Sequence, residues 1–251
     1  ILTGVVQLSF TRWVSDQLFA RRADIIVPNF AGVLLVTNLG AGTLAVMLAF
    51  LEFRGESALY RVLMVAGFVT MCDIWVATIF MSGLKFYKTI VVLFGGGYGI
   101  SVLLALLLRE YGLEGLLAGY VIGQFLMLAG MFFIILRSFP AERLIAFDCF
   151  RPGAMLPTLM AVGFLYNFAI WADKIVFWAL DGLRANGGIP HHPLYDSCFY
   201  LAYVTTVPAL AVNLVHLETG FYSRYRGFYA AVTGHASMRE IRRFGDAMRS
   251  S

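Results

Sequence analysis

Charge is what this sequence has least of. Only 14% of its 251 residues are Asp, Glu, Lys or Arg, against about a quarter in an average soluble domain. Hydrophobic residues make up 60% of the chain, and the mean hydropathy is +0.78. So few charges among long apolar runs exclude an ordinary soluble domain. They predict an all-α fold, a polytopic bundle of transmembrane helices.

Motifs of metal, redox and catalytic chemistry are missing as well. Cys72, Cys149 and Cys198 form no CxxC pair, and no HExxH pattern occurs. A solvated loop is the favoured interpretation of His191 and His192, because no third metal ligand lies at a helical or turn spacing from them. No Ser/His/Asp or Cys/His arrangement suggests a nucleophile. We therefore expect no enzyme activity, no metal, no cofactor and no disulfide, and the few basic residues give little support for nucleic-acid binding.

Six segments are long and apolar enough to cross a bilayer, since about 20 residues at 1.5 Å each span the ~30 Å hydrocarbon layer. They are predicted at residues 30–50, 62–84, 89–108, 115–136, 155–180 and 197–217. Residues 1–10 have the character of the last turns of a truncated span, so we interpret the chain as a fragment. Residues 11–29 predict an amphipathic helix on the membrane surface, closed by Pro28 and Asn29.

Lys and Arg are unevenly distributed between alternate loops. Of the 19 basic residues, fourteen fall on one side and only four on the other. The four are Arg54, Arg61, Arg109 and Arg184. By the positive-inside rule the rich side is cytoplasmic, and the fifth span then runs outward.

The fifth span carries adjacent charges, Asp173 and Lys174, in its outer half. Tyr166 and Asn167 lie about two turns earlier, and helical spacing predicts one polar stripe that Ile170 interrupts. A charge at membrane depth costs at least ~2.5–3.5 kcal/mol, which favours a wall of a water-filled cavity. The alternative is an internal ion pair, or a Lys174 that reaches for the outer interface.

The second span carries a lone carboxylate, Asp73, near its middle. One interpretation places it in a translocation path, or in a coupling cycle that protonates and deprotonates it. The other is a neutral Asp73 that is hydrogen-bonded to a neighbouring helix.

The last segment, residues 218–251, is basic and aromatic. Helical spacing of its aromatic residues predicts a helix that lies on the cytoplasmic membrane surface or docks a partner. A capping box at Ser237 and Glu240 predicts a second short helix. The candidate contact residues are Phe221, Arg224, Tyr225, Arg226 and Phe228.

Four collinear stretches resemble the PelG family, the polytopic inner-membrane subunits of the Pel exopolysaccharide export system. They are QLSFTRWVSDQLF, VPNFAGVLLV, YNFAIWADKIVFW and ETGFYSRYRGFYAAV. The family is similar to the MATE and flippase superfamily, which implies two helical lobes around a central cavity. On that basis residues 1–136 run from the end of helix 2 to helix 6 of the first lobe, and residues 137–153 form a cytoplasmic inter-lobe loop. Residues 154–217 are the first two helices of the second lobe, and residues 218–251 form a cytoplasmic interfacial tail.

The resemblance implies transport of an amino-sugar-containing exopolysaccharide across the bacterial inner membrane during biofilm matrix production. It also implies a cytoplasmic glycosyltransferase and other Pel membrane subunits as partners, beside the lipid bilayer and the polymer itself. Two alternatives stay open. One is an ion-coupled exporter of small molecules or lipid-linked oligosaccharides, and the other is a non-transporting anchor for a glycosyltransferase.

Overall fold

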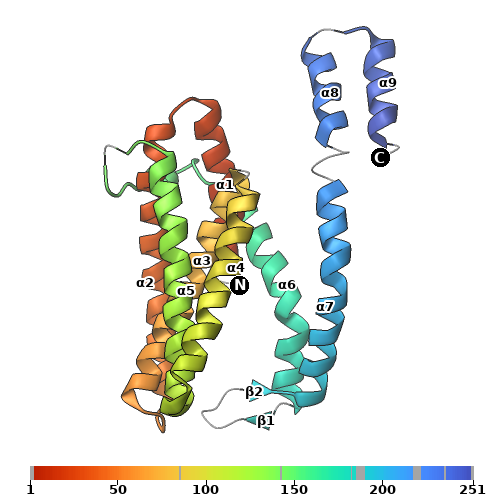
Figure 1. The fold of residues 1–251 in the computed structure, drawn as a ribbon. Coiled ribbons are helices and arrows are strands. Elements are labelled where there is room, and N and C mark those ends of the chain that lie inside the picture. Colours follow the sequence, from red (N-terminus) through yellow and green to blue (C-terminus); the bar gives the residue numbers. More distant parts are fainter. Residues whose placement is uncertain are drawn as a thin grey trace. The chain divides into compact units, whose positions relative to one another are not determined.

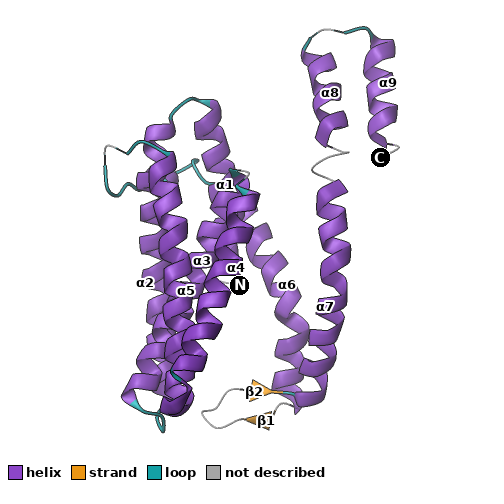
Figure 2. Cartoon of the chain, viewed as in Figure 1, coloured by secondary structure: helices purple, strands orange, loops and turns teal. Residues whose placement is uncertain are grey.

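The computed structural model describes residues 3–84, 86–141, 143–181, 183–184, 190–216, 222–234 and 236–249, and most of them are helical (Figures 1 and 2). The helices are α1 (Gly4–Phe19), α2 (Ile26–Glu52), α3 (Ala58–Gly83), α4 (Tyr87–Leu107), α5 (Gly112–Ser138), α6 (Pro157–Asp181), α7 (Pro193–His216), α8 (Tyr222–Thr233) and α9 (Met238–Arg249). Short 3-10 turns are η1 (Ala23–Ile25), η2 (Arg109–Tyr111) and η3 (Asp148–Phe150), and β1 (Leu183–Arg184) pairs with β2 (Pro190–His191). The chain divides into two units, Ile1–Pro190 and His191–Ser251.

Five helical segments of the described chain are long and apolar enough to cross a membrane. They are Ala23–Glu52, Ala58–Gly83, Tyr87–Leu107, Arg109–Ser138 and Pro157–Leu180. These segments confirm the first five predicted spans and the polytopic helical bundle. The sixth predicted span falls on α7, a helix of 24 residues with Pro208 inside it. That helix is not among the five, so its passage through the membrane stays a prediction.

The predicted start of the bundle is wrong. α1 continues without a break through Phe10 and Thr11, and residues 26–29 open α2 instead of closing a surface helix. Trp13 and Val14 are 5% and 4% exposed, so this part of α1 packs into the bundle. Arg12 and Asp16 pair on the opposite, exposed side of α1, and this polar side produced the surface-helix prediction.

Aromatic stacking forms the core where α1, α2 and α3 meet. The ring of Phe80 stacks on those of Phe30 and Phe10, with centroids 4.7 and 5.9 Å apart. Met81, Met131 and Ile135 are fully buried beside them, so α5 contributes to the same core. This core fixes α1 to the bundle near the end where α3 and α5 finish.

Small residues let α4 and α5 approach closely. Gly115, Gly119 and Gly123 recur every fourth residue on α5, and a Cβ atom at Gly119 or Gly123 would clash with the backbone of Ala105 or Ser101 on α4. Such stripes of small residues are a common device of membrane-helix packing. In the glycine-rich run of α4, Gly97 packs against Met127, whereas Gly95 and Gly96 face open space.

α6 joins the first unit through α1. The two helices touch at Gly4 and Gly163, where neither position has room for a Cβ atom. At the start of α6, the Leu156 N–H donates to Ser9 Oγ at 3.0 Å. α1 thus packs against α6 on one side and against α3 on the other (Figure 1).

Basic residues gather at one end of the first unit. The loop before α2 and the loop before α6 meet there, because Arg22, Arg143 and Arg151 line one pocket. The opposite end is identified by Ser57, which hydrogen-bonds Glu114 at the start of α5. Within the first unit, the arginines of the loops before α2 and α6 therefore lie at the end opposite to Ser57 and Glu114.

Candidate functional site

Asp73 lies inside the bundle of the first unit. It is 6% exposed, and Thr70, one turn earlier on α3, is 8% exposed. Asn38 of α2 lies beside the carboxylate, close enough to interact with it. Asp73 Oδ1 and Asn38 Oδ1 nevertheless have no hydrogen-bond partner among the described atoms, which is a costly state for buried polar groups.

Gln124 of α5 continues this polar region. It is fully buried, and its Nε2 donates to Ser101 Oγ of α4 at 3.0 Å, while its Oε1 lacks a partner in the described structure. Contacts of Tyr120 with Met71, and of Thr78 with Met131, set α3 and α5 in parallel register. That register places Gln124 near the level of Asp73. We define the polar layer as Asn38, Thr70, Asp73, Ser101 and Gln124.

The polar layer presents three buried oxygen atoms that lack a donor: Oδ1 of Asn38, Oδ1 of Asp73 and Oε1 of Gln124. Chemically, such a layer can hold a proton on the carboxylate or a small cation between oxygens. In the described residues no three His, Cys, Asp or Glu side chains gather to hold a metal ion.

The predicted stripe on α6 is divided in two. Asn167 is half-buried at the contact with α1, where its Nδ2 donates to the Gly163 carbonyl oxygen at 2.9 Å and packs against Gly4. Tyr166 is 66% exposed and Asp173 is also exposed, so both lie away from that contact. The contact with α1 thus uses the side of α6 that has small and amide side chains, and Asp173 in the C-terminal half of α6 stays exposed.

The ammonium group of Lys174 lies over an aromatic ring. Its Nζ lies 4.5 Å from the centroid of the Trp171 ring, a cation–π distance, and the ring of Trp178 lies 6.4 Å from that of Trp171. The backbone N–H of Lys174 donates to Asp173 Oδ1 at 2.8 Å. The C-terminal half of α6 therefore combines a carboxylate, an ammonium group and two indoles.

The basic tail folds as a helical hairpin of α8 and α9. The predicted capping box is confirmed, since Glu240 N–H donates to Ser237 Oγ at 3.4 Å and Ser237 N–H donates to Glu240 Oε2 at 3.2 Å. Phe228 packs against the Gly245 region of α9. Arg224 donates to the Ala247 carbonyl oxygen at 3.1 Å.

The hairpin divides the predicted contact residues of the tail by role. Arg224 and Phe228 contribute to the packing of the hairpin, whereas Tyr225 and Arg226 are exposed. A side-chain hydrogen bond with Tyr229 raises the pKa of the Tyr225 phenol. Phe221 lies outside the described residues.

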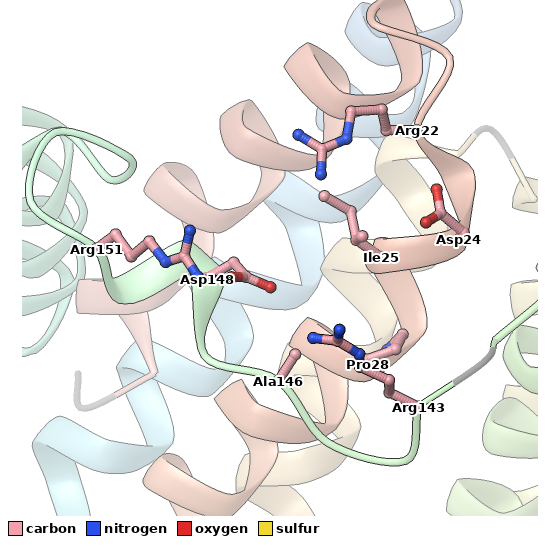
Figure 3. Close-up of a pocket in the computed structure, with 8 residues that line it drawn as sticks. All are labelled: Arg22, Asp24, Ile25, Pro28, Arg143, Ala146, Asp148 and Arg151. Carbon is pink, nitrogen blue, oxygen red and sulfur yellow. Dashed lines mark ion pairs between the residues drawn. The ribbon is translucent and has the colours of Figure 1, made fainter.

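A pocket of about 290 Å³ lies at the basic end of the first unit (Figure 3). Its lining is Arg22, Asp24, Ile25, Pro28, Arg143, Ala146, Asp148 and Arg151. Figure 3 shows Arg22 at the top, Arg143 at the bottom and the Arg151–Asp148 pair at the left. Sequence reasoning counted these arginines as loop charges and did not group them.

Asn29 lies behind the lining of this pocket and joins its two segments. Fully buried in the first turn of α2, it accepts the Cys149 N–H at 2.9 Å through Oδ1, and its Nδ2 donates to Ile25 O and Asp148 Oδ2. The Ala146 N–H donates to Pro28 O at 2.9 Å. The sequence offered one signal for this role, a polar residue directly after a proline at the start of a span. It could not identify the partners of Asn29, which lie 119 and 120 residues away in the chain.

Cys149 lies beside Asn29, to which its backbone N–H donates. It is fully buried, and its burial raises the pKa of the thiol to about 12. A thiol in such a site packs as a small apolar group and does not react as a thiolate.

The comparisons with known proteins agree with this architecture. The model of the PelG family, described as "Putative exopolysaccharide Exporter (EPS-E)", matches residues 1–251. No curated protein and no solved structure matches the chain. A family match along the whole sequence and five membrane-capable helices give the same assignment. The chain is a multi-pass membrane protein and belongs to the PelG family of exopolysaccharide exporters.

Proposed function

We propose that this protein moves an amino-sugar-containing exopolysaccharide across the bacterial inner membrane during matrix production, and that the open face of α6 lines the path. The observation that carries the proposal is Asp173, an exposed carboxylate on a helix of membrane-spanning length. Only 6% of the most apolar part of α6 is buried in the structure. Placing that carboxylate against lipid would cost at least ~2.5–3.5 kcal/mol, so it faces water or substrate.

The side chains around Asp173 suit a sugar polymer that carries amines. A carboxylate attracts an ammonium group of the polymer, and the rings of Tyr166, Trp171 and Trp178 offer apolar faces on which sugar rings can stack. Lys174 lies over Trp171 and would repel a cationic sugar from that ring. The position of Lys174 therefore limits how tightly the polymer binds. Weak binding is useful because a polymer in transit must also leave the site.

The polar layer supports a coupling role in the same proposal. Asp73 is enclosed by helices and bears an oxygen without a donor, so taking up a proton or a small cation there would change the packing of α2, α3 and α5.

In the same proposal, residues 1–136 form the first lobe, residues 137–153 connect the lobes, and residues 154–217 open the second.

The hairpin of α8 and α9 is the proposed contact of the cytoplasmic tail, residues 218–251, with a glycosyltransferase and the other membrane subunits. Tyr225 and Tyr229 are 41% and 49% exposed, with ring centroids 4.6 Å apart. Paired exposed aromatic rings beside arginines are typical of protein interfaces. This observation also favours the anchor function as a second candidate, in which the hairpin matters and the membrane acids do not.

Single substitutions test the α6 path. We expect Asp173→Ala to reduce polymer secretion about ten-fold, the effect of losing one charge-assisted contact of ~1.5 kcal/mol. Secretion is measured in cells with equal amounts of the protein in the membrane. Asp16→Ala, which removes an exposed carboxylate paired with Arg12, is the matched control and leaves secretion unchanged.

A double-mutant cycle separates a substrate site from a structural pair. Lys174→Ala alone and the combined change complete the cycle. If the double change is milder than either single change, Asp173 and Lys174 mainly stabilise each other and the path assignment fails. Normal secretion after Asp173→Ala, with loss of a membrane-bound glycosyltransferase after Tyr225→Ala, favours the anchor.

A further inference from the structure

Among the described residues that line the pocket at the basic end, positive charge is in excess, with three arginines against two aspartates. Asp148 is already engaged, because Arg151 pairs with it at 2.7 Å and Asn29 donates to its other oxygen. Within the described residues, no carboxylate oxygen lies within 4.0 Å of the guanidinium groups of Arg22 and Arg143. Asp24 offsets one of these two charges, so the open part of the pocket is cationic.

Backbone hydrogen bonds anchor the two segments that carry these arginines. Arg22 is the last residue of a Schellman turn at the end of α1. Its N–H donates to the Gln17 carbonyl oxygen at 3.0 Å. Arg21 has a φ of +58°, the left-handed conformation that this turn needs. Arg143 belongs to the loop that Asn29 ties to α2. The two guanidinium groups therefore reach one space from two fixed segments (Figure 3).

The pocket lies at one end of a segment that is long and apolar enough to cross a membrane. Its floor, Ile25 and Pro28, belongs to the span that starts at Ala23. Apolar side chains of the adjacent loop are exposed, with Leu144 at 90% and Ile145 at 49%, and Phe19 at the end of α1 is 93% exposed. Apolar side chains beside arginines are the pattern of a segment that sits among lipid headgroups.

We propose that this pocket binds the phosphate group of an anionic phospholipid headgroup. Guanidinium groups bind phosphate oxygens through paired hydrogen bonds, and basic pockets between membrane helices on the cytoplasmic side bind acidic headgroups. A volume of about 290 Å³ is just below the range of sites for drug-sized ligands and suits a headgroup. The acyl chains would then lie along the apolar surface beside Leu144.

Native mass spectrometry of the purified protein tests this proposal. The protein is titrated in detergent with phosphatidylglycerol, with phosphatidylcholine and with inorganic phosphate, and the lipid-bound fraction is measured. We expect tighter binding of phosphatidylglycerol than of phosphatidylcholine, and a loss of about five-fold in affinity for each of Arg22→Gln and Arg143→Gln. Arg54→Gln, at the opposite end and exposed, is the charge-matched control and retains the preference.

A further pair of variants guards against misfolding. Arg22→Lys with Arg143→Lys keeps the charges and is expected to retain most of the lipid preference, and each variant is checked by its helical circular dichroism. An unchanged preference in folded Arg22→Gln, Arg143→Gln protein overturns the proposal. The proposal is also overturned if inorganic phosphate binds as tightly as phosphatidylglycerol, because the ligand would then be a soluble phosphate. A third outcome also overturns it. If the arginine variants bind lipid normally but no longer copurify with a protein subunit, the pocket is a protein-docking site.

Discussion

Cys149 and Cys198 differ in the property that decides thiol reactivity, which is access to solvent. Cys149 is fully buried between α2 and its loop, whereas Cys198 is exposed on α7. A pKa of about 12 for Cys149 leaves only about one thiol in ten thousand ionised at pH 8. The raised pKa and the burial both lower the reactivity of the Cys149 thiol.

We therefore expect iodoacetamide at pH 8 to label Cys198 and to leave Cys149 unmodified in the folded protein. Peptide mass spectrometry measures the modified fraction of each cysteine. Denatured protein is the control, in which both cysteines become labelled. Labelling of Cys149 at the rate of Cys198 in folded protein would show that the loop does not pack on Asn29 as the structure has it.

Several residue assignments followed from local pattern, and several could not. Ser237 and Glu240 are three residues apart, so their capping box was readable and is confirmed. Asn29 meets Asp148 and Cys149 across more than a hundred residues, and no local signal announces such a contact. Asn167 shares helical spacing with Lys174, yet the close approach of α1 at Gly163 takes it out of the open face.

Among the secondary-structure elements, α4 and α5 depend most on close packing. Gly123→Ala introduces a Cβ that clashes with Ser101, and overpacking of this kind typically costs ~1–3 kcal/mol. Gly99→Ala, on α4 with open space around it, is the control and is expected to be neutral or slightly stabilising. Thermal unfolding in detergent should therefore separate the two variants, with only Gly123→Ala melting earlier. Equal midpoints would contradict the close α4–α5 contact.

Helices of spanning length were predictable because length and apolar composition determine them. The five membrane-capable segments correspond to α2 to α6, with η1 and η2 extending the segments of α2 and α5. The boundary of α1 was missed because Arg12 and Asp16 resemble the polar side of a surface helix, while Trp13 and Val14 face the core. The repeat of Gly115, Gly119 and Gly123 was present in the sequence and would have predicted a close helix contact on α5, though not that its partner is α4.

For the whole molecule, the distribution of charge and the alternation of helix ends agree. Arg22, Arg143 and Arg151 gather at one end of the first unit, and the sparse basic loops lie at the end where Ser57 meets Glu114. That arrangement suits a multi-pass exporter with a basic cytoplasmic side. Exposed Tyr166 and Asp173 on α6 then form the surface that the polymer is expected to touch.

Photo-crosslinking in secreting cells tests that contact most directly. A photoreactive amino acid replaces Tyr166 on the open face of α6, or Leu103 on α4 as a control that is 58% exposed and expected to face lipid. After irradiation, the purified protein is probed for covalently attached polysaccharide. We predict attached polymer at position 166 and none at position 103. No polymer at position 166, or equal amounts at both positions, would contradict a path along α6.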